Sequence, residues 1–317
     1  MHFQLTDDQR ALRDGVRELL EGRFGRQALR AALDAPGLDR ALWRELGEAG
    51  FFALRLPEAE GGVGLGLPEA VLAFEQVGRV LLPGPLVATH LAAGAGAGSE
   101  GAGSGAAVGA GVPGAATGET VVTAVQGGLV EWLDEADVVV GDASGAVPLR
   151  SVDPLTPLHR VPDREGANPH GEGTDPPAVL LTAAEQLGSA SRTCELAVQH
   201  ARAREQFGQP VGAFQAIKHL CAGMLERVET ARAAVYAAAV TADPLDIATA
   251  RLLADEAALR GARDCLQVHG GMGFTWESDV HLHLKRAWVR ACRSGDVTES
   301  EEALAGDLLS DPPGMAV

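Results

Sequence analysis

Two clusters in the C-terminal half of the chain combine residue types that suit a phosphorylated ligand. The first reads Arg-Glu-Gln-Phe-Gly and places Arg204 and Phe207 three residues apart, where glycine and Pro210 are expected to end a helix. A guanidinium group presents a planar fork of donors that suits a diphosphate, and an aromatic ring can lie against a nucleotide base. A helix end capped by its own arginine, with the phenylalanine in the core, would show the same residues. This cluster alone leaves both interpretations open.

The second cluster begins at Gln267 and reads Gln-Val-His-Gly-Gly-Met-Gly-Phe-Thr. Gly270 and Gly271 carry no side chain that would keep a ligand off the backbone, and the Gln267 amide can both donate and accept hydrogen bonds. His269 is expected to be structural. A glycine run of this kind is also typical of a plain turn between helices. The pairing of the two clusters is what indicates a binding site.

The paired clusters resemble the signature of the C-terminal helical domain of flavin-dependent acyl-CoA dehydrogenases. Their separation is similar to that in the family, and Lys218, His219 and Met224 stand between them at matching positions. The resemblance implies a mainly α fold with a small central β domain. By the same resemblance, the residues expected to contact an FAD bound mainly by a neighbouring subunit are Arg204, Phe207, Gln267, Gly270 and Gly271.

Composition and periodicity divide the chain into successive regions. Helical patterns, one of them capped at Thr6, dominate the beginning of the chain. They are followed by a Gly/Ala/Ser tract, which has too few large apolar groups to offset its ordering entropy. The predicted regions are an N-terminal helical domain (1–92), a mobile Gly/Ala-rich linker (93–118), a reduced β domain (119–163), a loop (164–177) and a C-terminal four-helix bundle (178–317).

The predicted β domain departs from the family pattern. Short β-branched runs at 120–125, 136–140 and 146–149 are separated by Gly127-Gly128 and by 142–145, which predicts hairpins. A full acyl-CoA dehydrogenase has a larger central barrel with a Thr-Glu-Pro-x-x-Gly-Ser-Asp-like stretch and a Trp-Ile-Thr/Ser segment that hold the flavin ring. Neither stretch is present here. The resemblance therefore implies that this chain does not cradle the ring with its own β domain.

The carboxylate base of the family is also missing from its usual place. In most members it is the glutamate of a Glu-Gly-Thr segment beyond the His-Gly-Gly motif, and the matching place here holds Ser294, followed by glycine and Asp296. Serine does not act as an unassisted base near neutral pH. A second family location falls near Ala178, with Glu185 further along the same helix. Glu185 and Asp296 are the candidate replacement bases, and each is alternatively a solvated or capping carboxylate.

Charge and composition exclude several other functions. The 317 residues carry a formal net charge of −17, which argues against nucleic acid and anionic membrane as partners. We find no signal peptide and no apolar run long enough to span a membrane, so the expected location is the cytoplasm. No metal site is predicted, because the four cysteines are scattered singly and His281 and His283 do not share a helix face.

These features lead to three hypotheses. The first is a short, base-lacking subunit that pairs with a longer acyl-CoA dehydrogenase subunit in an α2β2 assembly, completes its FAD site and acts on an acyl-CoA. The second is a homo-oligomeric acyl-CoA dehydrogenase with a relocated base. The third is a flavin-free scaffold that keeps the helical dimer surface. The sequence does not specify the acyl chain or the electron acceptor.

Overall fold

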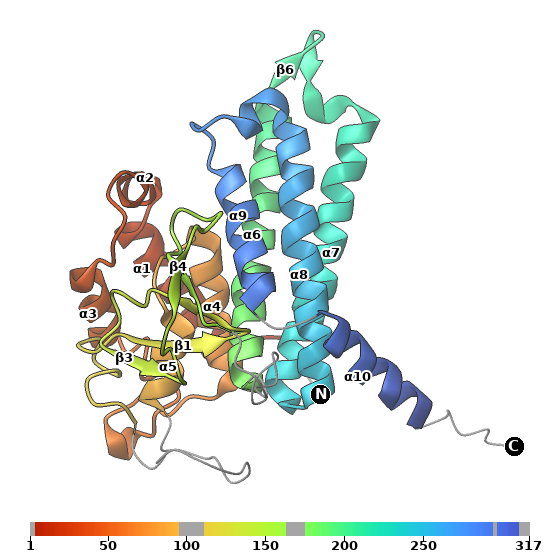
Figure 1. Cartoon of the computed structure of the whole chain (residues 1–317). Coiled ribbons are helices and arrows are strands. Elements are labelled where there is room, and N and C mark those ends of the chain that lie inside the picture. Colours follow the sequence, from red (N-terminus) through yellow and green to blue (C-terminus); the bar gives the residue numbers. More distant parts are fainter. Residues whose placement is uncertain (1–3, 95–110, 163–174, 294–296, 311–317) are drawn as a thin grey trace, which may run out of the picture. The chain divides into compact units, whose positions relative to one another are not determined.

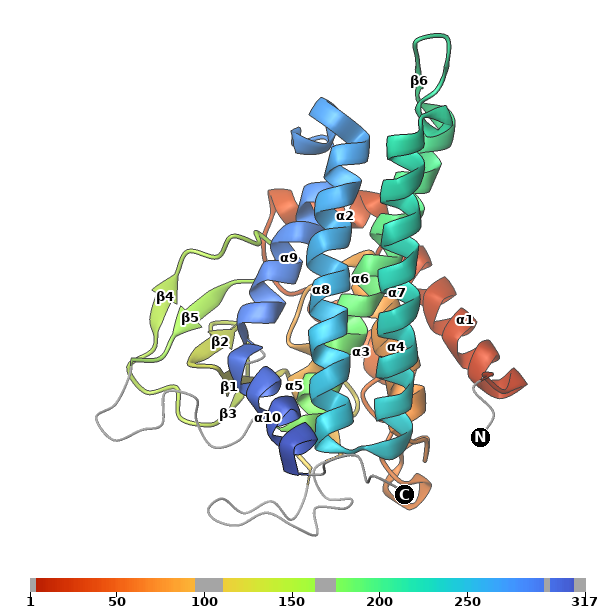
Figure 2. The same cartoon turned by 90° about the vertical axis from the view of Figure 1, so that its right-hand side faces the viewer.

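The computed structural model describes residues 4–94, 111–162, 175–293 and 297–310. The chain divides into two compact units, Met1–Gly171 and Glu172–Val317. The first unit contains helices and a small sheet, and the second is helical apart from a short hairpin (Figures 1 and 2). This confirms the predicted fold class. Within the described residues, no helix has both the length and the apolar character that crossing a membrane requires.

The first unit begins with helices, as predicted. They are α1 (Asp7–Arg23), α2 (Arg26–Asp34), α3 (Arg40–Glu48), the 3-10 turn η1 (Glu58–Glu60), α4 (Leu67–Val80) and α5 (Leu86–Ala93). Among them, α2 and α5 were not expected from the sequence. At the start of α1, the Thr6 hydroxyl accepts from the Gln9 N–H and the Gln9 side chain accepts from the Thr6 N–H. This reciprocal cap satisfies two backbone donors that the helix leaves unpaired, so the predicted start is confirmed.

The core of the first unit lies around α4. Phe74 on this helix is fully buried and contacts Phe51, with ring centroids 5.2 Å apart. Trp43 on α3 packs on Phe52 with centroids 4.8 Å apart. Buried aromatic rings contribute large apolar areas, and their tilted contacts add to that burial. These side chains therefore hold α3, α4 and the loop between them together.

A five-stranded sheet follows the helices. Its strands are β1 (Val122–Gln126), β2 (Leu129–Glu131), β3 (Val138–Val140), β4 (Val147–Leu149) and β5 (Leu158–Arg160), in the order β3-β1-β2-β5-β4. The predicted hairpin at Gly127-Gly128 joins β1 to β2, and both glycines have positive φ, as a tight hairpin turn requires. The prediction of a hairpin at 142–145 is wrong, because β3 pairs in parallel with β1 and β4 lies at the opposite edge. The sequence patterns missed the three-residue strands β2 and β5.

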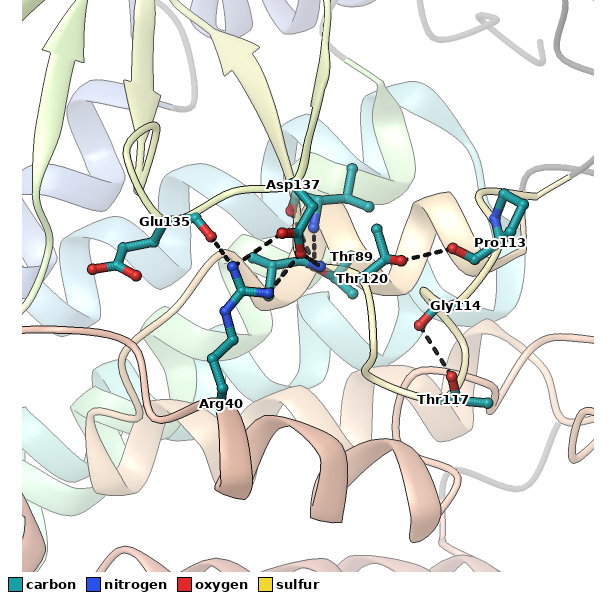
Figure 3. A network of polar contacts seen from close by, with 10 residues as sticks. Arg40, Thr89, Pro113, Gly114, Thr117, Thr120, Glu135 and Asp137 are labelled. Carbon is teal, nitrogen blue, oxygen red and sulfur yellow. Dashed lines mark hydrogen bonds and ion pairs between the residues drawn. The ribbon is translucent and has the colours of Figure 1, made fainter.

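An ion pair fastens the start of α3 to this sheet (Figure 3). Arg40 places Nη1 2.6 Å from Oδ2 of Asp137 and Nη2 3.2 Å from its Oδ1. Asp137 Oδ2 also accepts from the backbone N–H of Val121 at 2.8 Å. The hydrogen bond from Arg40 is the main reason why the pKa of Asp137 lies below its usual range. A bidentate pair of this kind sets direction as well as distance.

Part of the predicted linker is packed rather than mobile. Residues 95–110 lie outside the described part, whereas Gly111–Gly118 forms turns in which Ala115 is fully buried. A Cβ on Gly47 would lie 2.1 Å from the Thr117 carbonyl, and one on Gly118 would lie 2.3 Å from the Trp43 carbonyl oxygen. Two backbones approach closely here because neither glycine has a side chain. The low apolar content of this stretch therefore reflects close packing against α3.

The second unit is built on four helices that pack side by side (Figures 1 and 2). Its elements are α6 (Pro176–Ala203), β6 (Glu205–Gln206), β7 (Gln209–Pro210), η2 (Val211–Ala213), α7 (Gln215–Thr241), α8 (Pro244–His269), η3 (Gly270–Phe274), α9 (Val280–Arg293) and α10 (Val297–Ser310). α6 packs against α7, α8 and α9, and α8 also contacts α7 and α9. One helix face of α7 is buried through Met224, Val228, Ala231, Val235 and Ala238. This spacing is the helical period that the sequence predicted.

The first unit should lose stability in acid because of His90. This residue on α5 is 2 % exposed and its ring meets Phe74. Burial, followed by the charge of Arg55, lowers the pKa of His90 to about 4. The unfolded chain protonates His90 near its ordinary pKa of about 6.5, so this stabilisation is complete above that pH and is lost as pH falls toward 4.

We therefore expect the free energy of unfolding of wild type to fall by about 3 kcal/mol more than that of His90→Leu between pH 7 and pH 4. This difference follows from the lowered pKa of His90 in the folded state. Urea unfolding at several pH values measures the difference. His219→Gln, which alters an exposed histidine, should follow wild type. Parallel pH profiles for wild type and His90→Leu would contradict the assignment.

Candidate functional site

The two sequence clusters lie at the same end of the second unit. α6 and α8 both finish there, and their last turns meet through His200 and His269, whose ring centroids are 4.1 Å apart with 27° between the planes. Figures 1 and 2 show the β6 hairpin at this end of the bundle. The fold thus brings together residues that are far apart in the chain.

Arg204 lies directly after α6 rather than in its last turn. Its backbone is extended, its N–H donates to the His200 carbonyl at 2.8 Å, and its own carbonyl accepts from the Val211 N–H at 2.7 Å. These two bonds fix the backbone on both sides of the residue. The side chain is exposed, so its guanidinium group stands at the surface at the end of the bundle.

Phe207 occupies the turn between β6 and β7, and it is not the core residue of the alternative interpretation. It is 90 % exposed, and its φ of 54° is followed by 78° at Gly208. A hairpin turn with positive φ at both central positions is of the type I′ kind, and a bulky L-residue adopts positive φ only at an energetic cost. The ring touches Phe214 edge-on, with centroids 6.0 Å apart. A strained and exposed aromatic residue is characteristic of a functional position.

The glycines of the second cluster differ in what requires them. Gly270 has φ 60° and ψ −142°, which a residue with a side chain rarely adopts. A Cβ on Gly273 would lie 2.9 Å from the Leu266 carbonyl, so packing excludes a side chain there. Among the described residues, a Cβ on Gly271 would meet nothing within 4 Å. Gly271 is therefore required by neither conformation nor packing, and its backbone is open to a molecule from outside, as is the exposed side chain of Gln267.

Three exposed apolar side chains at this end were not singled out in the sequence. Met272 is 59 % exposed, Phe274 73 % and Trp276 55 %. The Trp276 ring stacks on His281, and the ammonium nitrogen of Lys285 lies 4.8 Å from the ring centroid. Lys285 therefore makes a cation–π contact with Trp276. The signal available in the sequence was the run of large apolar residues directly after two glycines.

Glu185, one of the two candidate bases, is neither solvated nor a helix cap. It is buried on α6, and its Oε2 lies 3.0 Å from Nε of Arg290 on α9. The guanidinium of Arg290 therefore engages this carboxylate in an ion pair. Ser294 and Asp296, which mark the usual base position and its neighbour, lie outside the described residues.

A second buried carboxylate, Asp255 on α8, was also missed by the sequence analysis. Its Oδ1 accepts from Nε2 of Gln186 at 2.8 Å, and Oδ2 lies 3.7 Å from Nε of Arg251. Burial raises the pKa of Asp255 to about 6, opposed by the Gln186 bond and by Arg251 and Arg290. The Gln186 amide also donates to the Ala287 carbonyl at 3.1 Å. These contacts form a polar layer that joins α6, α8 and α9.

The two histidines considered for metal binding contact different partners. His283 places Nδ1 2.8 Å from the Ser189 hydroxyl, whereas His281 stacks on Trp276. In the part of the chain that the structure describes, no three His, Cys, Asp or Glu side chains are arranged to hold a metal ion. The cysteines are all unbridged, at positions Cys194, Cys221, Cys265 and Cys292.

Comparison with known proteins places this geometry in a family. The sequence model described as acyl-CoA dehydrogenase, N-terminal domain, matches residues 6–119, and the one described as acyl-CoA dehydrogenase, C-terminal domain, matches residues 179–296. Acyl-CoA dehydrogenase IpdE2 of Mycobacterium tuberculosis is 37% identical over 302 residues, covering 89% of this chain and 91% of the relative. Acyl-CoA dehydrogenase FadE34 of the same organism is 34% identical over 331 residues, covering 89% of this chain and 45% of the relative.

Solved structures give the same fold. A chain in the crystal structure of the ChsE4-ChsE5 complex from Mycobacterium tuberculosis has a TM-score of 0.76 and 25% identity, with 99% of this chain and 100% of that chain covered. A chain in the glutaryl-coenzyme A dehydrogenase structure with glutaryl-CoA has a TM-score of 0.79 and 20% identity, covering 98% of this chain and 97% of that chain.

The buried ion pair predicts a stability effect. In Glu185→Gln, the buried charge of Arg290 loses its direct ion-pair partner, and breaking such a pair costs about 3 kcal/mol. Glu256→Gln is the matched control, because Glu256 and Arg260 pair at 3.0 Å with side chains 44% and 65% exposed. The control should change stability by less than about 0.5 kcal/mol. Urea unfolding compares the two variants, and equal stabilities would show that the Glu185 pair contributes no more than an exposed one.

Proposed function

Because the chain belongs to the acyl-CoA dehydrogenase family, we propose that it is the smaller subunit of a heteromeric acyl-CoA dehydrogenase and completes the FAD site of its partner. The reaction of such an assembly is the α,β-dehydrogenation of an acyl-CoA thioester. FAD, when bound, supplies the acceptor for the hydride that leaves the β carbon. The residues of this chain contact the cofactor across the interface with the partner subunit.

The observation that carries this proposal is the conformation of Phe207. A ring that is 90 % exposed on a residue with φ 54° combines unfavourable solvation with unfavourable backbone geometry. Nothing among the described residues covers it beyond the edge contact with Phe214. A flat ligand that lies across the ring would remove apolar surface from water, which would offset the energetic cost of the strained Phe207 backbone.

The other expected residues fit the same cofactor. Arg204 offers a guanidinium fork at the surface, which suits a diphosphate. Gly270 and Gly271 leave open space where a Cβ would stand, so the backbone can be approached closely. The exposed amide of Gln267 can orient a polar edge by donating or accepting. All four lie at the end of the bundle where the last turns of α6 and α8 meet.

Two features support a partner that supplies the ring cradle and the base. The sheet of the first unit has strands of at most five residues, and the chain lacks the family's ring-holding stretches. Glu185 is engaged by Arg290, and serine stands at the usual base position, Ser294. A solved relative is itself a complex of two named chains, ChsE4 and ChsE5. We assign the proton abstraction to the partner and cofactor retention across the interface to this chain.

The first test is the flavin content of the purified protein. Alone, the chain should be colourless and should not dehydrogenate acyl-CoA thioesters. Co-expressed with a longer acyl-CoA dehydrogenase subunit, it should give a yellow complex with one flavin per heterodimer, measured by visible absorbance and native mass spectrometry. Stoichiometric flavin with dehydrogenase activity in the chain alone would favour the homo-oligomeric enzyme. A colourless complex would favour the flavin-free scaffold.

Site variants test the individual roles. Arg204→Ala should weaken FAD retention in the heteromer by up to about a hundredfold, because a charge-assisted bond of about 1.5–3 kcal/mol is lost. The control is Arg202→Ala, an exposed arginine in the last turn of α6. Gly271→Ala should leave the free chain as stable as wild type but should speed FAD release. Unchanged flavin dissociation in Arg204→Ala would refute the role of Arg204.

A further inference from the structure

The stacked pair His200–His269 joins the two halves of the proposed cofactor end. The rings lie 4.1 Å apart between the last turns of α6 and α8, and both residues are half-buried. Nδ1 of His269 lies 2.8 Å from the Cys265 carbonyl oxygen. A carbonyl only accepts, so Nδ1 carries the hydrogen and Nε2 of the neutral ring keeps its lone pair. The pair can therefore bind a proton without breaking this bond.

Burial and the neighbouring charges oppose protonation of His200 when no anion is present. Burial, then His269, then Arg204 lower the pKa of His200. Two imidazolium rings in a stack would repel each other, so the pair holds at most one added proton near neutral pH. The helix C-termini are the main favourable influence, since they attract cations.

The neighbouring elements carry other titratable groups. Lys218, His219 and Cys221 stand in the first turns of α7, which packs against both helices. Cys265 lies on α8 one turn before His269. The 3-10 turns η2 and η3 consist of uncharged residues. Asp264 on α8 pairs with Arg227 on α7, and Glu205 and Glu277 flank the two motifs in the sequence. An anion bound at Arg204 would add a further negative charge near the pair.

We propose that the His200–His269 pair takes up a proton when a diphosphate-bearing nucleotide binds at Arg204, and so supplies a second positive charge to that site. The inference rests on the proposed function and extends it to how the site recognises its ligand. An anion beside Arg204 offsets the charge that opposes protonation of His200, and the proton comes from the solvent. Binding of the nucleotide therefore strengthens as pH falls.

Calorimetric titration of the flavin-depleted heteromer with FAD tests this at about pH 6 in two buffers of different ionisation enthalpy. The difference in heat measures proton uptake, and we expect up to about one proton per FAD and none with riboflavin, which lacks the diphosphate. In the double variant His200→Phe, His269→Phe, which keeps two flat rings, uptake should vanish. FAD should bind this variant about tenfold more weakly at pH 6 and with unchanged affinity at pH 8. A rise of about one pKa unit on FAD binding corresponds to a tenfold change in affinity. His219→Gln is the control and should behave as wild type.

A second measurement does not depend on the variant folding. Histidine NMR titration of the wild-type heteromer should show the pKa of the pair rising when FAD binds. FAD binding without proton uptake, or an unmoved histidine titration, would overturn the inference and leave the proposed function intact. Failure of the heteromer to bind FAD at all would instead refute the proposed function.

Discussion

Close packing of α6 against α8 is the constraint on which the second unit depends. Both helices bury small side chains along the bundle, among them Ala190 and Ala197 on α6 and Ala254 and Ala262 on α8. Small residues let helix axes approach closely, and tight interiors tolerate little displacement. Because the two helices finish together, His200 meets His269 and the two motifs form one surface. The candidate site is thus a consequence of helix packing more than of any loop.

Small side chains alone would leave the register of such helices weakly specified. The polar layer supplies direction, because hydrogen bonds and ion pairs need particular partners. Glu185 on α6 pairs with Arg290 on α9, and Gln186 joins Asp255 on α8 to the α9 backbone. A shift of one helix would leave buried polar groups unpaired, which costs more than the bonds contribute. The layer therefore selects one arrangement of the bundle. It also engages the carboxylate of Glu185, one of the two candidate bases.

The first unit is also held together by close backbone approach and by an ion pair. Gly47 and Gly118 allow the turns after residue 110 to lie against α3, and Arg40 then ties that helix to Asp137 at the sheet. The sheet itself is short and carries β4 at one edge with all three residues exposed. The buried Thr89 hydroxyl on α5 also donates to the Val122 carbonyl and accepts from the Val122 N–H, which joins that helix to β1.

The sequence by itself determined the helical character of both ends of the chain, the cap at Thr6 and the family signature, because each depends on residues close together in the chain. Thr6 caps its own helix, and Arg204, Phe207 and the glycines from Gly270 can be recognised as motifs before any contact is known. Tertiary structure decided the rest. The parallel pairing of β3, the ion pair of Glu185 and the meeting of His200 with His269 all join distant segments. Local propensity carries no information about such partners, since burial and electrostatics act on whatever the fold brings near.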